Sequence, residues 1–432
     1  MNTIVKQLFV DALEANSPSN LINDWVSLQG SNMSVGAKEW TIGEKQDLYV
    51  LAVGKASRPM AKALKNKLDV SSSHILCITP ETKGLEKYCF SSTHPIPDIK
   101  SRKAADKLIS FAEQIPSDSL VIFALSGGAS ALVCKPADDM NLPDMNTVNK
   151  MLLESGANIE EVNSVRKHLS EVKGGQLLSY LRPDCTLIDL VISDVPNDNL
   201  EIIGSGLTTP DSSTFQDAYD TLLRYELWEK LPENIQGHIE KGLTGEVPET
   251  IKPGHDPIAN HTSFIIGSAK KFADTIAEMA ADEGFNTWVA EKPFNQPVDE
   301  VTKMVADRIK RVGDDNKDAT VMVFYGESTV NVTGGGKGGR NQELALRGAL
   351  EIEGMEGVTW LSAGTDGVDG PTDAAGAMVD GSTIARAKEK GLNVEKFISE
   401  NDSYHFHEQV GTLLKTGPTG NNIMDIVIVL VE

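Results

Sequence analysis

The sequence is poor in cysteine and has no long apolar run. The longest aliphatic run, residues 426–431, is far too short to cross a bilayer. The first eleven residues also lack the uninterrupted apolar core of a signal peptide. The four cysteines form no C-x-x-C pair and lie in apolar or strand-like surroundings: Cys77, Cys89, Cys134 and Cys185. We therefore expect reduced core cysteines in a cytoplasmic protein.

Positive charge is also scarce. The 432 residues include 40 Lys and Arg against 62 Asp and Glu, which gives a formal net charge of −22. Such a surface repels nucleic acid and anionic lipid, so we expect neither as a partner. A phosphorylated or carboxylate ligand is repelled at long range as well. A site for an anion must therefore be built locally from lysine, arginine, backbone N–H groups or a metal ion.

Short apolar runs that end in glycine, serine or aspartate recur along the chain, and most precede a helical pattern. In the first half we expect strands at residues 48–53, 74–79, 120–125 and 187–192. Because these runs are continuously apolar, we expect a parallel, Rossmann-like sheet covered on both faces by helices. Ligands of such sheets bind beyond the carboxyl ends of the strands. Several strand ends with small polar residues point to one crevice.

The segment 252–257, Lys-Pro-Gly-His-Asp-Pro, interrupts the pattern and predicts a linker. We expect an N-terminal domain over 1–252 and a C-terminal domain over 258–432, each with α/β layers. The second series is predicted to begin with a strand at 262–267 and to continue with strands at 287–290, 320–325, 358–362 and 426–431. The active site is expected in the cleft between the two domains.

The glycine-rich segment 333–339 is the most informative part of the chain. A strand-like run at 329–332 precedes it and an apparent helix follows from Arg340. Glycine lets successive backbone N–H groups converge on one point, and a helix start adds positive potential. The predicted phosphate-binding residues are Gly335, Gly336, Lys337, Gly338 and Gly339. The segment lacks the spacing of a Walker A loop, and a flexible hairpin with solvated cations is the alternative.

Two further loops follow predicted strands of the first domain. Lys55 lies where the first strand turns into a helix, and it is expected to point into the crevice. A dinucleotide fingerprint needs G-x-G-x-x-G here, and Gly54 stands alone, which argues against NAD. The loop after the third strand can wrap a carboxylate or phosphate with backbone and hydroxyl donors, or it is simply a tight turn: Ser126, Gly127, Gly128, Ala129 and Ser130.

A predicted helix at residues 160–181 carries Arg166 and Lys173 among its polar residues. These form either a solvated face or a basic wall of the crevice. His94, in a proline-rich segment, is interpreted as part of a structural corner, and Asp211 as a helix N-cap.

Aspartates follow two other strands. Asp194 ends the fourth strand, and Asp366 and Asp369 lie in a glycine-rich turn. Mg²⁺ bound through one or two carboxylates plus ligand phosphates fits this pattern, although aspartates are also ordinary turn residues. A last loop near the C-terminus combines glycine with hydroxyl groups: Thr416, Gly417, Thr419 and Asn421.

Taken in order, the motifs closely resemble the glycerate 2-kinase family, whose C-terminal part is called the MOFRL domain. The matching segments span residues 53–422: VGKAS, HPIPD, SGGAS, VNSVRKHLSEVKGG, SDVP, GSGLTTPD, GKGGRNQELAL, GTDGVDGPTDAAGA and TGPTGNN. The resemblance implies ATP-dependent phosphorylation of D-glycerate on its 2-hydroxyl with a divalent metal. We separately expect a monomer or homodimer. It places the two catalytically important residues of the family at Lys55 and Arg340.

The site residues fall into three groups. Substrate is expected at residues 126–130 with Arg166 and Lys173, and nucleotide at 335–339 with the 416–421 loop. The metal is expected at Asp194, Asp366 and Asp369. Two alternatives remain open: an NAD(P)H-dependent hydroxypyruvate reductase, and a non-catalytic protein that binds a phosphorylated metabolite.

Overall fold

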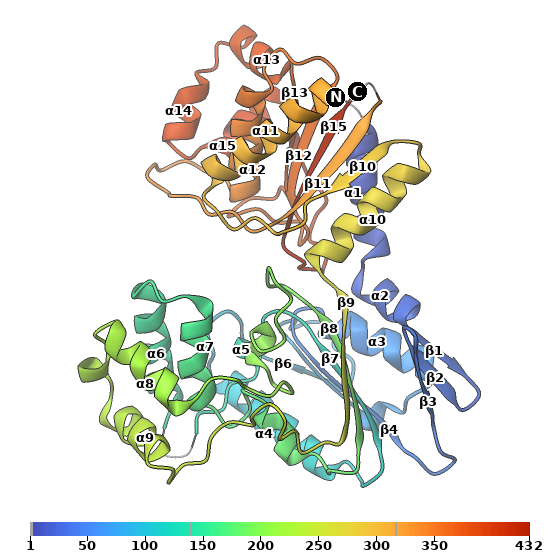
Figure 1. Cartoon of the computed structure of the whole chain (residues 1–432), viewed down its shortest axis with the longest axis vertical. Helices are drawn as coiled ribbons and strands as arrows, with labels where there is room; N and C mark the ends of the chain where they lie inside the picture. Colours follow the sequence, from blue (N-terminus) through green and yellow to red (C-terminus); the bar gives the residue numbers. More distant parts are fainter. Residues whose placement is uncertain (1–2, 138–139, 316–317) are drawn as a thin grey trace. The chain divides into compact units, whose positions relative to one another are not determined.

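The chain folds into two compact units. The computed structural model describes residues 3–137, 140–315 and 318–432. The parallel-sheet unit comprises Ile22–Ser193 and Asp198–Ile266, and the mixed-sheet unit comprises Met1–Leu21, Asp194–Asn197 and Gly267–Glu432 (Figure 1). These limits differ from the predicted boundaries at 252 and 258, because each unit takes in a segment from the other side of that linker.

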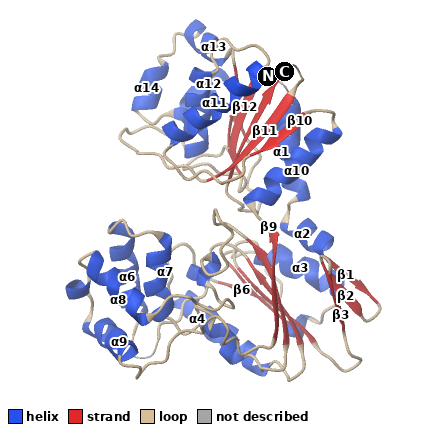
Figure 2. Ribbon diagram, in the orientation of Figure 1, coloured by secondary structure: helices blue, strands red, loops and turns tan. Residues whose placement is uncertain are grey.

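A six-stranded sheet forms the centre of the parallel-sheet unit, in the order β6-β5-β4-β7-β8-β9 (Figure 2). Chain order renumbers this as 3-2-1-4-5-6, the order of doubly wound nucleotide-binding folds. The pairs from β6 through β8 are parallel, as predicted. The strands are β4 (Leu48–Val53), β5 (Ile75–Thr79), β6 (Cys89–Ser91), β7 (Leu120–Leu125), β8 (Thr186–Ile192) and β9 (Asn260–Gly267).

The edge strand β9 was predicted to open the second α/β series, and that assignment is wrong. It pairs with β8 at the edge of the parallel-sheet unit. The buried Asp189 of β8 explains this position, because its carboxylate accepts hydrogen bonds from His261 Nε2 and Ser263 Oγ of β9, both at 2.8 Å. An apolar run predicts that a strand forms, but these polar contacts determine which sheet the strand joins.

Helices surround the parallel sheet, and a group of them forms a second apolar core beside it (Figure 1). The helices of the unit are α3 (Ser57–Leu68), α4 (Ile99–Gln114), α5 (Ala129–Leu132), α6 (Leu142–Glu154), α7 (Ile159–His168), α8 (Phe215–Arg224) and α9 (Glu233–Leu243). Helix α2 (Pro18–Trp25) leads into a small antiparallel sheet of β1 (Val26–Gln29), β2 (Asn32–Val35) and β3 (Lys38–Thr41).

The helix predicted over 160–181 is shorter in the structure. Helix α7 ends at His168, and a separate 3-10 turn follows at Gln176–Tyr180. Gly174 and Gly175 have φ angles of 62° and 78°, which a right-handed helix does not allow. The chain therefore turns back, and this turn brings Lys173 beneath the loop after β7.

A mixed sheet forms the centre of the other unit, in the order β10-β11-β15-β12-β13-β14. Within the described ranges, β10 and β11 pair in parallel and the other neighbouring strands of this sheet pair antiparallel. The strands are β10 (Asn286–Val289), β11 (Thr320–Gly326), β12 (Val358–Gly364), β13 (Gly376–Asp380), β14 (Leu413–Leu414) and β15 (Asp425–Val431). Strand β11 ends at Gly326, so the predicted strand at 329–332 is instead the start of a long loop.

The mixed-sheet unit has helices from both ends of the chain. Helix α1 packs against α10, and Figure 1 shows the two beside each other. The helices are α1 (Thr3–Ala15), α10 (Ala269–Asp282), α11 (Val298–Asp315), α12 (Arg340–Glu351), α13 (Thr383–Glu389), α14 (Val394–Ser399) and α15 (Ser403–Val410). No helix in the described ranges has the length and apolar character that spanning a membrane requires.

Candidate active site

The loops after β4 and β7 are joined at the switch point of the parallel sheet, where the strand order reverses. Lys55 N donates to Gly127 O at 2.9 Å, and Ala56 N donates to Ser126 Oγ at 3.0 Å. A Cβ on Gly54 would lie 2.1 Å from Ser126 Oγ, so only glycine allows this approach. The two predicted strand-end loops therefore form one rigid structure.

A cavity of about 610 Å³ opens beside these loops, wholly within the parallel-sheet unit. Gly128, Ser130, Arg166 and Lys173 from the predicted substrate group all line it, and His94 joins them. A Cβ on Gly128 would come within 3.0 Å of the His94 ring and 3.2 Å of Lys55 Cγ. Glycine at this position thus leaves the imidazole and the lysine close to the cavity.

Two of the cations beside this cavity, Lys55 and Arg166, are not paired with a carboxylate among the described residues, whereas Lys150 at its rim pairs with Glu154 at 3.7 Å. In the described parts of the chain, no carboxylate lies within ion-pair distance of Lys55 or Arg166. Arg166 Nε instead donates to the Asn149 side chain at 2.8 Å. Burial lowers the pKa of Arg166, and burial together with Lys55 lowers the pKa of His94. Although the formal net charge of the chain is −22, this hollow is locally cationic and suits an anion.

Lys173 supports the wall of the cavity from below. Its side chain is only 2% exposed and donates to Ser130 O at 2.7 Å and Val133 O at 3.1 Å. Burial lowers its pKa to about 8. The alternative of a solvated polar face is therefore wrong for this region, since Lys167 and Lys173 are both buried.

Three predicted substrate residues do not face the cavity. Ser126, Gly127 and Ala129 are buried, and Ser126 is occupied by its bond to Ala56 N. They hold the shape of the loop instead. Asp211 is not a helix N-cap either: Thr214 caps α8, and Asp211 pairs with Lys167 Nζ at 2.9 Å.

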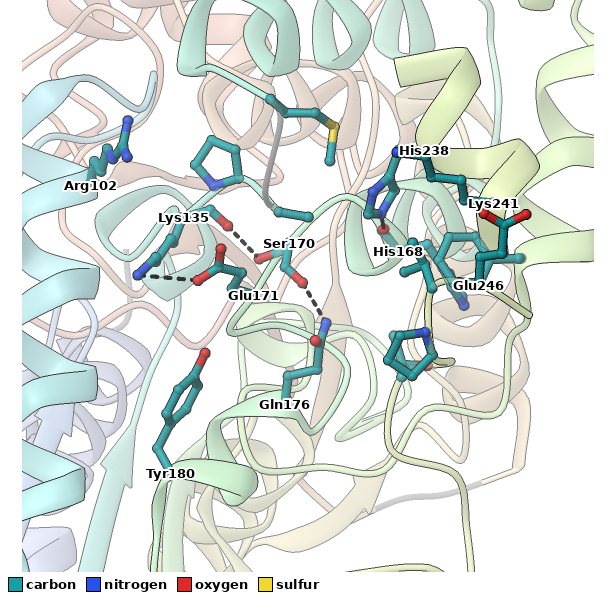
Figure 3. A pocket seen from close by; sticks show the side chains of 17 residues that line it. Arg102, Lys135, His168, Ser170, Glu171, Gln176, Tyr180, His238, Lys241 and Glu246 are labelled. Carbon is teal, nitrogen blue, oxygen red and sulfur yellow. Dashed lines mark hydrogen bonds and ion pairs between the residues drawn. The ribbon is translucent and has the colours of Figure 1, made fainter. Parts of the chain in front are cut away.

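A second cavity, of about 620 Å³, lies elsewhere in the same unit and contains none of the predicted site residues (Figure 3). Lys135, which lines it, pairs with Glu171 and Asp106 at 3.1 Å each. On its other side His238 Nε2 lies 2.9 Å from the His168 carbonyl oxygen. These groups already satisfy one another, in contrast to the cations near Gly128.

In the mixed-sheet unit, Arg340 lies at one end of the sheet. Asp425 begins β15, and its register partners Gly326 and Gly364 end β11 and β12. Arg340 Nε lies 2.5 Å from Asp425 Oδ2, its Nη2 lies 3.1 Å from Oδ1, and Nη1 pairs with Glu327. Burial raises the pKa of Asp425 to about 6, although Arg340 opposes this. Arg340 is thus fixed by two carboxylates.

The glycine-rich loop 333–339 differs from the predicted phosphate cradle. Its amides donate to a neighbouring turn: Thr333 N and Gly334 N to Asn401 Oδ1, Gly336 N to Glu400 O, and Lys337 N to Asp402 Oδ1. A Cβ on Gly334 would lie 2.3 Å from the Glu400 backbone. The glycines therefore permit close packing against residues 400–403. Lys337 Nζ lies over the Tyr404 ring, 4.3 Å from its centroid.

The predicted metal residues have different surroundings. Asp369 is buried and accepts hydrogen bonds from Asn341 N at 3.1 Å and Gln342 N at 2.8 Å, so it satisfies the first turn of α12. Asp366 is half-buried at the end of β12 and accepts from Val368 N. Asp194 belongs to the same mixed-sheet unit. Within the described ranges, no three His, Cys, Asp or Glu side chains are grouped to hold a metal.

The C-terminal loop packs onto the turn that carries Asp366. Thr419 N donates to Asp366 O at 3.0 Å, and Thr419 Oγ1 donates to Thr365 O at 2.6 Å. Gly417 O would lie 2.0 Å from a Cβ on Gly367. Thr416 is exposed, whereas Asn421 is buried and donates to Asn16 O of the N-terminal segment. The structure brings Thr416, Gly417 and Thr419 together with Asp366, while Asn421 points to the N-terminal segment.

Sequence reasoning missed two residues. Asp425, which orients Arg340, lay unnoticed at the start of a strand, and no motif signals its pairing. His94 was interpreted as part of a corner, yet its ring lies beside Gly128 at the cavity. The prolines around His94 were the available signal, since a rigid segment can also hold a functional side chain.

Known proteins resemble the chain over most of its length. Residues 4–240 match the family described as "Domain of unknown function (DUF4147)", and residues 320–425 match the MOFRL family. A glycerate 2-kinase of Pyrococcus horikoshii is 39% identical over 98% of this chain and 96% of its own. A D-glycerate 2-kinase of Thermotoga maritima is 36% identical over 89% of this chain and 90% of its own. A putative hydroxypyruvate reductase of Agrobacterium vitis is 34% identical over 88% of this chain and 98% of its own.

Solved structures agree with the fold. The crystal structure of a glycerate kinase from Thermotoga maritima, 34% identical in sequence, covers 100% of both chains with a TM-score of 0.86. A Pyrococcus horikoshii crystal structure, 39% identical, covers 98% of this chain and 97% of its own with the same TM-score. With these full-length relatives and the MOFRL match, the chain belongs to the glycerate 2-kinase family.

Proposed function

We propose that this protein transfers the terminal phosphoryl group of ATP to the 2-hydroxyl of D-glycerate. The bond between the γ-phosphorus and its bridging oxygen breaks, and a bond from that phosphorus to the 2-oxygen forms. The products are ADP, 2-phosphoglycerate and the proton released from the hydroxyl. The observation that carries the proposal is the cationic hollow beside the joined loops of Lys55 and Gly128, in a chain whose relatives are named as glycerate 2-kinases.

Lys55 and Arg340 are proposed to stabilise the negative charge on the transferred phosphoryl group. Phosphoryl transfer requires positioning and electrostatic stabilisation more than covalent chemistry from the protein. Lys55 has no ion-pair partner in the described ranges, so its charge is available to a ligand. Arg340 is held in a fixed orientation by Asp425. That both act on one phosphoryl group stays a prediction.

Mg²⁺ is proposed to arrive with ATP rather than to occupy a resident site. The absence of a three-residue cluster in the described ranges fits this, because Mg²⁺ keeps several waters and uses one or two carboxylates plus phosphates. Asp366 and Asp194 are the candidate carboxylates, while Asp369 is committed to α12. When bound, the ion would neutralise charge on the phosphates.

Product analysis tests the reaction directly. The protein is incubated with MgATP and D-glycerate, and phosphorus NMR identifies the product. We expect 2-phosphoglycerate with stoichiometric ADP. Formation of 3-phosphoglycerate would contradict the proposed acceptor oxygen, and the absence of any phosphorylated product would contradict the kinase assignment.

Substitutions test the assigned roles. Lys55→Ala and Arg340→Ala are each expected to lower kcat by about a hundredfold or more, as loss of one group stabilising transition-state charge does in other enzymes. The matched control for Lys55 is Lys62→Ala, an exposed lysine on α3 in the same unit. Near-normal turnover of either site variant, with the circular dichroism spectrum unchanged, would remove that residue from the mechanism.

A reductase is the other candidate, because some relatives carry that name. The strand order suits a dinucleotide, but the loop after β4 offers Gly54 alone where the fingerprint needs three glycines. Loss of NADH absorbance with hydroxypyruvate, in the absence of ATP, would favour this function.

A further inference from the structure

We propose that the cavity between residues 94–97 and helix α6 binds the base of the nucleotide, with the phosphates directed to Gly128 and Lys55. The inference rests on the proposed function, and it assigns the nucleotide to the parallel-sheet unit. It therefore departs from the expectation that residues 335–339 bind the nucleotide.

The size and lining of the cavity suit a base better than a three-carbon acid. Its volume of about 610 Å³ lies in the range of cavities that hold drug-sized ligands. Apolar side chains form most of one wall: Pro95, Ile96, Pro97, Met145 and Leu153. D-Glycerate is polar at every carbon and gains nothing from such a wall. A purine presents flat apolar faces that pack well against proline and leucine.

Hydrogen bonds within the protein hold the apolar wall in place. Asn146 of α6 donates from Nδ2 to Pro97 O at 3.0 Å, which ties the helix to the proline segment. Asp98 then caps α4 by accepting from Lys100 N at 2.7 Å. Ile96 and Leu153 remain 70% and 66% exposed, although both are large and apolar. A cavity wall with exposed apolar side chains is typical of a binding site for an apolar group.

The opposite end of the cavity suits a polyphosphate. Gly128 lies against Lys55, and Arg166 and Lys173 line the same hollow. One glycerate carboxylate needs a single cation, whereas the phosphates of ATP carry several negative charges. Three basic residues without a carboxylate partner in the described ranges match the more highly charged ligand.

The glycine-rich loop of the mixed-sheet unit is less suited to holding the phosphates. Four amides of the 333–337 segment already donate to residues 400–402. A nucleotide placed there would have to displace these contacts, whereas the cavity near Gly128 is open.

Photolabelling locates the base directly. The intact protein is irradiated with 8-azido-ATP and Mg²⁺, digested, and analysed by mass spectrometry, with excess ATP as competitor. We expect ATP-protected labelling on peptides that contain residues 94–97 or 145–154. ATP-protected labelling confined to residues 333–340 or to the 400–404 turn would overturn the inference. Absence of any protected label would overturn it too.

Substitutions give an independent test with a matched control. Leu153→Glu and Ile96→Glu place a carboxylate on exposed positions of the wall, so folding should not depend on them. We expect each to raise the KM for ATP at least tenfold and to leave the KM for D-glycerate within twofold. Leu223→Glu, an exposed leucine on α8 of the same unit, is expected to change neither.

The outcomes separate this inference from the proposed function. A raised KM for D-glycerate alone would assign the cavity to the acceptor. Unchanged KM values for both substrates would leave the apolar wall without a role in binding. Either result refutes the inference while the kinase activity stands. Conversely, calorimetry with ADP can show weakened binding in Leu153→Glu even if no glycerate is phosphorylated. That result would support the nucleotide site and refute the acceptor.

Discussion

Replacing Asp425 by asparagine should separate stability from activity in the mixed-sheet unit. Asp425 is 2% exposed, and its carboxylate holds Arg340 through two hydrogen bonds of 2.5 and 3.1 Å. Burial raises its pKa to about 6 from an ordinary value of 3.8, despite the attraction of Arg340. This difference corresponds to about 3 kcal/mol by which the ionised carboxylate weakens folding at neutral pH.

The sign of the pH dependence follows from the two pKa values. Between about pH 4 and pH 6, the folded chain retains a proton on Asp425 that the unfolded chain has released. The contribution of Asp425 to the free energy of unfolding therefore falls as the pH rises through this window, and it is level above it. Asparagine has no such proton. From pH 7.5 to pH 5, the stability of Asp425→Asn relative to wild type should fall by roughly 1 kcal/mol.

At neutral pH the turnover of Asp425→Asn should fall, although the variant no longer carries the buried charge that weakens folding. The amide cannot make a charge-assisted bidentate pair, so Arg340 loses its fixed orientation. We expect kcat to fall by about tenfold to a hundredfold, because small displacements of a positioning group have effects of that size. Urea unfolding followed by circular dichroism at pH 5 and 7.5, with kcat measured at pH 7.5, checks both parts.

Asp380→Asn is the matched control in the same unit. Burial opposes its charge, but hydrogen bonds from Ser382 and Arg386 outweigh burial and lower the pKa of Asp380 to about 2. Its ionised form therefore stabilises the fold, and its asparagine variant should be less stable at pH 7.5 with kcat unchanged. The reasoning fails if Asp425→Asn shows the same stability loss at both pH values, or if it retains full turnover.

Two further predictions concern packing. Gly336→Ala should lower the unfolding midpoint, because a Cβ there would lie 2.5 Å from Glu400 O. A Cβ on Gly335 would meet nothing within 4 Å, so Gly335→Ala should leave the midpoint unchanged. Equal midpoints for the two variants would contradict the packing role. His261→Gln should loosen β9: burial opposes the charge of His261, but Asp189 and a second aspartate raise its pKa to about 9. The wild type should therefore lose stability as the pH rises through 9, and a wild-type curve as flat as that of the variant between pH 7 and 10 would refute this.

The strands of the parallel sheet were predictable because burial on both faces leaves a clear pattern. The runs at Leu48–Val53 and Leu120–Leu125 have the predicted bounds, and a small residue follows each, Gly54 and Ser126. The place of β9 was not predictable, since a run of apolar residues carries no information on its neighbour. The contacts of Asp189, 72 residues before His261, settle that question in the structure.

In the candidate site, too, some features were predictable from the sequence and others were not. Local chemistry predicted that the loops of Lys55 and Gly128 lie together, because parallel strands end at one edge of their sheet. Partners distant in sequence were missed. Asp425 lies 85 residues beyond Arg340, and nothing near either residue indicates the pair.

Glycine content alone does not distinguish a loop that binds a ligand from a loop that packs against the protein. A glycine-rich loop is needed wherever a Cβ would collide, and the colliding group can be a ligand or the protein itself. Around Gly336 the space is filled by residues 400–402, which also take the amide hydrogens of the loop. Beside Gly128 a cavity opens, and in the described ranges Lys55, Arg166 and Lys173 have no carboxylate partner there, whereas Lys150 pairs with Glu154. The position of an anion is therefore indicated by unpaired positive charge next to open volume, and glycine marks only where such an approach is sterically allowed.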